Sequence, residues 1–273
     1  MTHWRFFVTG GISDLVKYSQ TVNRNLMIGM LMEHTPAVEL YTGQLRELDH
    51  QFSDTCISVK LSNFDYDAGH CRDFFSEIFP TTTNTWNFDA EEHETRDKYN
   101  QITDELLKIA PPRVMSKTYQ CYFPDTIMEV NRDLIRYGEH LGFKLVRGAY
   151  HATEPENVVY QRKEQTDLNY RTILKQLVEM TNNQVIVASH NVSDVEYIIE
   201  AHASSSDNSE SSESSLGRLQ TAQLMGMNED LQQKVVASGI HSYLYVPYGP
   251  FYYCFPYLFR RLVENYHMMK HIR

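Results

Sequence analysis

Residues Phe143–Tyr150 read FKLVRGAY, and this stretch decides the fold. Phe143–Val146 is a short strand-like run, and an arginine, two small residues and a tyrosine follow it at once. A helical pattern over Asp125–Gly142 precedes the run, and another over Asp167–Thr181 follows it. A strand between two helices is the repeating unit of α/β proteins with parallel strands.

The same alternation continues in both directions along the chain. A further helical pattern covers Val192–Ala201, and Gly29–Met32 is a weaker strand candidate. The other strand-like runs are Ile57–Leu61, Thr85–Phe88, Val114–Tyr122, Gln184–Ala188, Ala222–Met225 and Tyr243–Val246. With the weak candidate the chain has the eight strands that close a (βα)8 barrel. Without it, an open doubly wound sheet is the alternative.

Composition excludes several classes of protein. The chain has 273 residues, enough for one barrel of about 250 residues. Its formal net charge of −10 argues against a nucleic-acid partner but not against a small anionic ligand. None of the four cysteines stands in a Cys-x-x-Cys pair, which predicts free thiols and no zinc site. The chain has no apolar run long enough to span a membrane and no visible targeting segment.

Ala203–Ser215 reads ASSSDNSESSESS, which is acidic and low in complexity. Such a segment cannot bury enough apolar surface to order itself, so we expect a disordered surface loop without a function of its own. It interrupts the alternation of helices and strands. We therefore interpret it as an insertion within one domain that covers residues 1–273.

Polar residues lie within or directly after successive strand runs. Asp89 follows the second run, Gln120 lies within the third, and Arg147–Tyr150 follows the next. His190-Asn191 and Pro247-Tyr248-Gly249 repeat the pattern. Because the carboxyl ends of parallel barrel strands form one face, these residues are predicted to share one site.

A second cluster of chemistry-bearing residues follows Pro256, which suits the first position of a helix. Tyr257, Arg260, Arg261 and Glu264 then share one helical face. Two arginines beside a tyrosine suit a carboxylate, which a guanidinium binds through two parallel hydrogen bonds. The alternative is a solvated face with an ion pair one turn apart.

Each of the other motifs also has two interpretations. Arg147-Gly148-Ala149-Tyr150 lets a flat or anionic cofactor approach the backbone, or it is a strand-end turn. His190-Asn191 binds a cofactor, or His190 is a structural histidine. Asp89 is the first residue of the acidic run DAEEHE. Carboxylates are favoured at a helix N-terminus, so the run fits such a terminus, and only one of its acidic residues need be functional.

Taken in order, these segments resemble the proline dehydrogenase family, in its eukaryotic mitochondrial form. The resemblance covers about residues 56–265. The segments that carry it are SVKLS (58–62), DAEE (89–92), TYQCY (118–122), KLVRGAY (144–150), TDLNY (166–170), ASHN (188–191), QLMGM (223–227), YVPYGP (245–250) and PYLFRRLVEN (256–265). The resemblance implies an α/β fold, a distorted TIM-like (βα)8 barrel with the last helix over the active site.

The resemblance also implies a role for each matched residue. The substrate carboxylate is bound by Arg260, Arg261 and Lys60, and Glu264 supports the arginines. Tyr257 and Leu224 line the proline ring, Tyr245 closes over it, and Asp89 orients Tyr245 or its neighbours. The FAD site comprises Gln120, Lys144, Arg147, Gly148, Ala149, Tyr150, His190 and Asn191, with Lys144 near flavin N5. No covalent flavin attachment and no metal are implied.

The activity implied is oxidation of L-proline to pyrroline-5-carboxylate by hydride transfer to flavin, the first step of proline catabolism. The electrons pass to a quinone, and eukaryotic members act in mitochondria beside the inner membrane. Tyr245 would crowd a ring hydroxyl, so proline is favoured over hydroxyproline. A hydroxyproline dehydrogenase, and a degenerate member that binds proline or a partner without catalysis, are the alternatives.

The N-terminal half departs from the family. Relatives have a longer segment where Asn63–Asn84 connects two strands here. The family's first strand is followed by a glutamate, and Met30–Glu39 matches that pattern poorly, with Glu33 and Glu39 both candidates.

Overall fold

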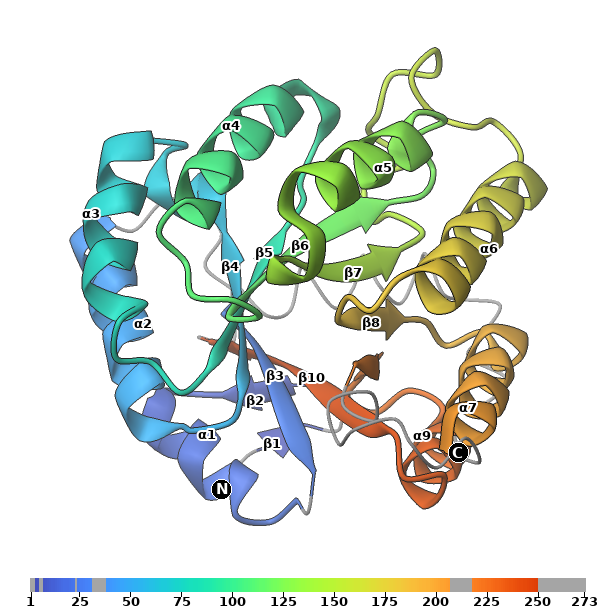
Figure 1. Ribbon diagram of the computed structural model, residues 1–273. Helices are drawn as coiled ribbons and strands as arrows, with labels where there is room; N and C mark the ends of the chain where they lie inside the picture. Colours follow the sequence, from blue (N-terminus) through green and yellow to red (C-terminus); the bar gives the residue numbers. More distant parts are fainter. Residues whose placement is uncertain (1–2, 5–6, 23, 31–37, 207–217, 250–273) are drawn as a thin grey trace.

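The computed structural model of this chain describes residues 3–4, 7–22, 24–30, 38–206 and 218–249. Eight parallel strands form a closed barrel, because β10 pairs with β3 along one edge and with β9 along the other (Figure 1). These strands are β3 (Asn25–Met30), β4 (Cys56–Lys60), β5 (Thr85–Asp89), β6 (Met115–Gln120), β7 (Gly142–Val146), β8 (Val185–Ala188), β9 (Leu219–Leu224) and β10 (His241–Gly249). The barrel is therefore confirmed, and the open sheet is excluded.

Helices surround the ring of strands (Figure 1). They are α1 (Ile12–Ser19), α2 (Val38–Gln51), α3 (Ala68–Ile78), α4 (Arg96–Leu107), α5 (Thr126–Tyr137), α6 (Lys163–Met180), α7 (Val192–Ser206) and α9 (Glu229–Ala237). Short 3₁₀ turns stand at η1 (Leu61–Phe64), η2 (His93–Thr95) and η3 (Gly138–His140). Two short strands, β1 (His3–Trp4) and β2 (Phe7–Thr9), pair with each other, and β2 joins the far end of β10.

The structure corrects several predicted boundaries. Gly29 and Met30 of the weak strand candidate are the end of β3, which begins at Asn25, and 31–32 lie outside the described residues. Pro247-Tyr248-Gly249 belongs to β10 and does not follow it. Asp89 ends β5, and α4 begins only at Arg96, so most of the acidic run forms a loop and the 3₁₀ turn η2.

The structure also corrects one prediction about a loop and shows what the short connection between β4 and β5 contains. Helix α7 continues to Ser206, so Ala203–Ser206 is helical, and 207–215 lies outside the described residues. The connection Asn63–Asn84 contains α3, whose N-terminus is capped because Asp67 accepts a hydrogen bond of 2.8 Å from the His70 amide. A short connection thus still supplies a barrel helix.

Strand side chains alternate between the helices outside and the barrel interior. Outward residues such as Trp86, Phe88 and Tyr119 are buried beneath the helices. Inside the barrel, an apolar cluster joins five strands through Met27, Cys56, Ile186, Ala222 and Tyr243. The interior of β4–β6 is polar, with Asn87 donating to Ser58 (3.3 Å) and accepting from Ser116 (3.1 Å). The interior is thus divided into an apolar and a polar part.

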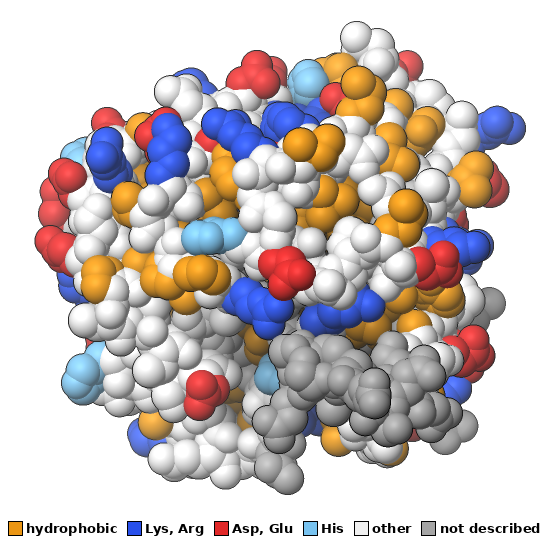
Figure 2. All heavy atoms as spheres, viewed as in Figure 1, with side chains coloured by type: hydrophobic (Ala, Val, Ile, Leu, Met, Phe, Trp, Pro, Cys, Tyr) orange, Lys and Arg blue, Asp and Glu red, His pale blue; other side chains and the backbone are white. Residues whose placement is uncertain are grey.

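The surface carries both signs of charge. Figure 2 shows Lys and Arg side chains interspersed with Asp and Glu over the face that carries α3–α6. None of the helices in the described residues combines the length and apolarity that crossing a bilayer requires. Cys56, Cys71 and Cys121 are buried free thiols, as predicted, and Cys254 lies outside the described residues.

Candidate active site

Six of the predicted site residues lie at the carboxyl ends of barrel strands or just below them. Strand register places Lys60 beside Asp89, and Leu224 beside Tyr245. The other two, Gln120 and Lys144, lie on the adjacent strands β6 and β7. Residues from six strands are therefore gathered at one end of the barrel, in the arrangement by which (βα)8 enzymes build their active sites.

An ion pair crosses the interior between β5 and β7. The Lys144 ammonium donates to Asp89 Oδ1 at 2.7 Å, and the lysine side chain is only 6% exposed. Asp89 Oδ1 also accepts from Asn87 Nδ2 at 2.8 Å. The same ammonium lies 5.4 Å from the centroid of the Tyr245 ring. Asp89 therefore contacts Lys144, which lies beside Tyr245. The family resemblance implied that Asp89 orients Tyr245 or its neighbours, and this contact is with a neighbour.

Gln120 is held by its neighbours in a single orientation. Its Nε2 donates to the Glu91 carbonyl at 2.7 Å, so its Oε1 must be the acceptor for the Tyr122 hydroxyl. The same hydroxyl lies 3.1 Å from Glu154 Oε1, and both Glu154 oxygens accept from the His93 amide at 3.0 and 3.1 Å. The loops after β5, β6 and β7 are thus tied together through Gln120.

Gly148 is required by the same network. Its φ of +125° is a conformation that side chains disfavour, and a Cβ there would lie 1.8 Å from two ring carbons of Tyr122. The Tyr122 amide also donates to the Arg147 carbonyl at 2.9 Å. After the neighbouring Ala149, the Tyr150 carbonyl accepts from the amides of Thr153 and Glu154, which turns the chain back toward Tyr122. The RGAY segment is therefore fixed through backbone contacts.

The Arg147 guanidinium is held by two carboxylates. Its Nε donates to Asp167 at 2.6 Å, and its Nη1 lies 2.9 Å from Asp194, while its guanidinium carbon lies 4.3 Å from the Tyr170 ring centroid. Burial lowers the pKa of Arg147, but hydrogen bonds to Asp167 and Asp194 outweigh burial and raise it. Its Nη2 is buried without a hydrogen-bond partner among the described residues. The arginine is thus anchored on two nitrogens and presents the third.

His190 is a neutral donor. Its Nε2 accepts from the Leu224 amide at 3.1 Å, so the proton of the neutral ring must be on Nδ1. Burial lowers the pKa of His190 to about 4. The buried Nδ1–H has no partner within the described part of the chain. Asn191, in contrast, accepts from the Ser193 amide at 3.1 Å in the first turn of α7, which is a structural role.

Other predicted residues are less constrained or not described. The Lys60 amide donates to the Tyr41 hydroxyl at 3.3 Å, and its Nζ has no acceptor among the described residues. Glu39 is exposed in the first turn of α2 and not at a strand end. The predicted last helix with Tyr257, Arg260, Arg261 and Glu264, and also Glu33, lie outside the described residues.

Sequence reasoning missed the partners that hold the site residues. Asp167, Asp194, Tyr122 and Glu154 were not singled out as site residues, yet each contacts one or more of them. Asp167 and Tyr122 lie inside the quoted segments TDLNY and TYQCY, which was the available signal. Asp194 and Glu154 stand outside every quoted segment. Contacts between distant parts of the chain identify them.

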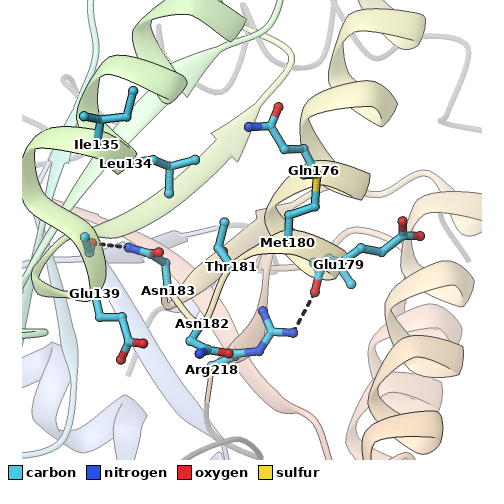
Figure 3. A pocket seen from close by; sticks show the side chains of 12 residues that line it. Leu134, Ile135, Glu139, Gln176, Glu179, Met180, Thr181, Asn182, Asn183 and Arg218 are labelled. Atoms are coloured by element: carbon cyan, nitrogen blue, oxygen red, sulfur yellow. Dashed lines mark hydrogen bonds between the residues drawn. The ribbon is translucent and has the colours of Figure 1, made fainter.

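A groove of about 640 Å³ lies at the end of the barrel opposite the candidate site (Figure 3). It is lined by the ends of α5 and α6 and by residues that precede β8 and β9, such as Asn183 and Arg218. Arg218 Nη2 donates to the Val178 carbonyl at 2.7 Å and so caps α6. Asn183 likewise donates to the Leu141 carbonyl at 2.9 Å, and none of the predicted site residues lines the groove.

The comparisons with known proteins agree with the fold. The chain is 27% identical over 285 aligned residues to human proline dehydrogenase 1, mitochondrial, which covers 95% of the chain and 44% of the relative. It is 30% identical to the Drosophila melanogaster protein of the same name, over 68% of the chain and 30% of the relative. Hydroxyproline dehydrogenase of Xenopus laevis is 30% identical over 57% of the chain. The chain thus spans less than half the length of these curated relatives.

Solved structures show the same architecture. Proline utilization A (PutA) from Bdellovibrio bacteriovorus, inactivated by N-propargylglycine, superimposes with a TM-score of 0.76 at 20% identity. That match covers 96% of this chain and 32% of the PutA chain. A profile of the proline dehydrogenase family matches residues 33–273, and the chain therefore belongs to the proline dehydrogenase family.

Proposed function

We propose that this protein is an FAD-dependent proline dehydrogenase that oxidises L-proline to pyrroline-5-carboxylate, the first step of proline catabolism. Family membership supports the reaction class. The observation that carries the proposal is the Lys144–Asp89 pair beside Tyr245, because it provides a fixed cation and an aromatic wall inside the barrel end. The substrate is a small zwitterion, for which such a site is suited.

The residues present fit a flavin cofactor. His190 Nδ1–H and Arg147 Nη2–H are buried donors without partners among the described residues, so both can donate to a ligand rich in acceptors. Gly148 lets the backbone pack against the Tyr122 ring and so holds the Arg147 segment in place beside these donors. FAD would supply the hydride acceptor, while the protein supplies orientation and electrostatics.

Each site residue then has a defined task. Lys144 is proposed to lie near flavin N5, with Asp89 fixing its ammonium, and Gln120 is oriented by Tyr122 to meet the flavin ring. Lys60, whose ammonium is not paired with any described residue, joins Arg260 and Arg261 in binding the substrate carboxylate. Leu224, Tyr245 and Tyr257 enclose the ring of the substrate, and Glu264 supports the arginines. Orientation of this kind is what converts binding into a reactive geometry.

Tyr245 favours proline over hydroxyproline. Its ring lies in the interior beside Lys144, so a hydroxyl on the substrate ring would meet the phenol in a confined space. The relative from Xenopus laevis named hydroxyproline dehydrogenase makes hydroxyproline oxidation the second candidate. A degenerate member that binds proline or a partner without turnover is the third.

We further propose a mitochondrial location with peripheral contact at the inner membrane and a quinone as electron acceptor. The relatives named mitochondrial support the location. Fractionation of cells that express the full natural protein would test it: the protein should sediment with mitochondria and be released by salt or carbonate.

The central experiment is the flavin spectrum of purified protein before and after proline is added without oxygen. We expect yellow protein that bleaches with proline and reduces a quinone or dye at a higher kcat/KM with proline than with hydroxyproline. Protein that retains no flavin after FAD is supplied would favour the non-catalytic alternative. A higher kcat/KM with hydroxyproline would favour the second candidate.

A further inference from the structure

Strand β3 carries a glycine, Gly29, beside the Tyr245 side chain. Strand β10 runs parallel to β3, with Tyr245 opposite Met27 and Pro247 opposite Gly29. The Tyr245 side chain leans toward the C-terminal end of the strands. Its hydroxyl end therefore lies over Gly29, two residues beyond Met27. The phenol therefore occupies the place where residue 29 would carry a side chain.

The approach is too close for any other residue. A Cβ on residue 29 would lie 2.1 Å from the Tyr245 hydroxyl oxygen, 2.5 Å from Cζ and 2.9 Å from Cε1. Favourable contacts between carbon atoms occur at about 3.5–4 Å. Because three atoms of the ring edge are involved, rotation of the hydroxyl alone does not relieve the overlap. An alanine at position 29 must displace the whole ring.

The direction of that displacement follows from the barrel. Gly29 lies on the wall formed by β3, and Lys144 on β7 faces the ring from across the interior at 5.4 Å from its centroid. A ring pushed away from Gly29 therefore moves into the interior, toward Lys144. The space between Tyr245 and Lys144 becomes smaller.

We propose that Gly29 is a specificity-determining residue that acts through Tyr245. By accepting the phenol against β3, it keeps open the space for a five-membered cyclic imino acid without a ring substituent. This inference rests on the proposed function, in which Tyr245 closes over the substrate ring. A larger residue at position 29 narrows the site and shifts its preference toward smaller rings.

A kinetic double-mutant cycle tests the proposal. Gly29→Ala is measured alone and combined with Tyr245→Ala, using L-proline as substrate and L-azetidine-2-carboxylate, the four-membered analogue, as competitive inhibitor. One methylene in a pocket is worth roughly 10- to 200-fold in discrimination. In the Gly29→Ala protein we expect KM for proline to rise on the order of 10-fold, while Ki for azetidine-2-carboxylate rises less. In the Tyr245→Ala background, adding Gly29→Ala should change neither value by more than about twofold.

The same cycle measured by thermal unfolding tests the contact without any substrate. Gly29→Ala should lower Tm when Tyr245 is present and leave it nearly unchanged in the Tyr245→Ala protein. Gly43→Ala is the matched control, since Gly43 is exposed in α2 and its Cβ would meet nothing within 4 Å. It should leave KM and Ki unchanged and should not lower Tm.

The outcomes are distinguishable. Equal losses of kcat/KM on both backgrounds overturn the proposal, because Gly29 would then act independently of Tyr245. Coupling in Tm without a change in the proline-to-azetidine ratio confirms the contact and overturns the role in specificity. If Gly29→Ala does not fold, the double variant should restore folding, and its failure to do so also contradicts the proposal. Wild-type protein that does not oxidise proline overturns the proposed function itself, which the Tm cycle does not affect.

Discussion

Two lysines on the neighbouring strands β6 and β7 each pair with an aspartate, and the two pairs lie on opposite sides of the barrel wall. Lys144 meets Asp89 at 2.7 Å inside the barrel, and Lys117 meets Asp133 of α5 at 2.8 Å between barrel and helices. The first pair lies beside Tyr245 at the proposed site. The second is fully buried beneath α4 and α5.

The outer pair is completed by protein groups alone. Lys117 also donates to Asn100 Oδ1 at 2.9 Å, and Asp133 accepts from the Tyr119 hydroxyl at 2.8 Å. Burial would raise the pKa of Asp133, but Lys117, Arg132 and Tyr119 together hold it below its ordinary value. The inner pair, in contrast, leaves part of Asp89 exposed, with 17% of its side chain accessible. The two pairs thus have similar lengths, and it is their surroundings that differ: the outer pair is closed off by protein, and the inner pair borders the proposed site.

The largest expected effect is on stability, from Lys117→Met. The variant removes the buried cation beside Asp133 and leaves the partly exposed Arg132 as its charged partner, which costs up to about 3–5 kcal/mol in the free energy of unfolding. Denaturant titration measures this loss. Protein that remains folded should keep the wild-type kcat/KM. A loss below about 1 kcal/mol would show that the outer pair is dispensable.

The inner pair should behave in the opposite way. Asp89→Asn removes the charge that fixes the Lys144 ammonium but keeps an amide oxygen for Asn87. We expect kcat/KM for proline to fall by about 100-fold, equivalent to about 2.7 kcal/mol, with a loss of stability under about 1.5 kcal/mol. Steady-state kinetics and denaturant titration on the same samples test this. A variant that loses stability but retains activity would reverse the comparison.

Sequence alone predicted the barrel and the candidate site residues that gather at its strand ends, but not the division between the two pairs. Lys117 stood inside a predicted strand, two positions from Tyr119 and three from Gln120. Its outward direction follows from strand parity once Gln120 is known to face inward. The partners Asp133, Asp167 and Asp194 come from later helices, and helix pattern alone does not say which strand residue they meet. The sequence signal for strand β3 was weak because its residues, NLMIGM, include only one β-branched side chain.

A pH series sharpens the comparison at His190. Its folded pKa of about 4 lies below the ordinary value of 6.5, so the unfolded chain binds the proton first as pH falls. Stability is therefore unaffected above pH 7 and is lost as pH falls from 6.5 toward 4, by roughly 2 kcal/mol between pH 7 and pH 5. His190→Gln should lose less stability than wild type over this interval. Parallel curves for the two proteins would show that His190 does not titrate in this way.

The smallest expected effect comes from a change in the loops after β5, β6 and β7, which extend the inner site. The experiment distinguishes whether these loops act on the site through their charge or through their shape. Glu154→Gln keeps an oxygen that accepts from the His93 amide. It also adds an amide NH2 that can donate to the Tyr122 hydroxyl oxygen, so the Tyr122 hydroxyl proton is directed to Gln120. The fold should be unaffected, while removal of a negative charge near the proposed flavin site should raise the flavin reduction potential. We expect kcat/KM to change by about 10-fold or less. Glu139→Gln, in the exposed pair with Arg113, is the control and should change neither value. If Glu154→Gln leaves the reduction potential unchanged but weakens FAD binding, the network positions the loops by shape alone.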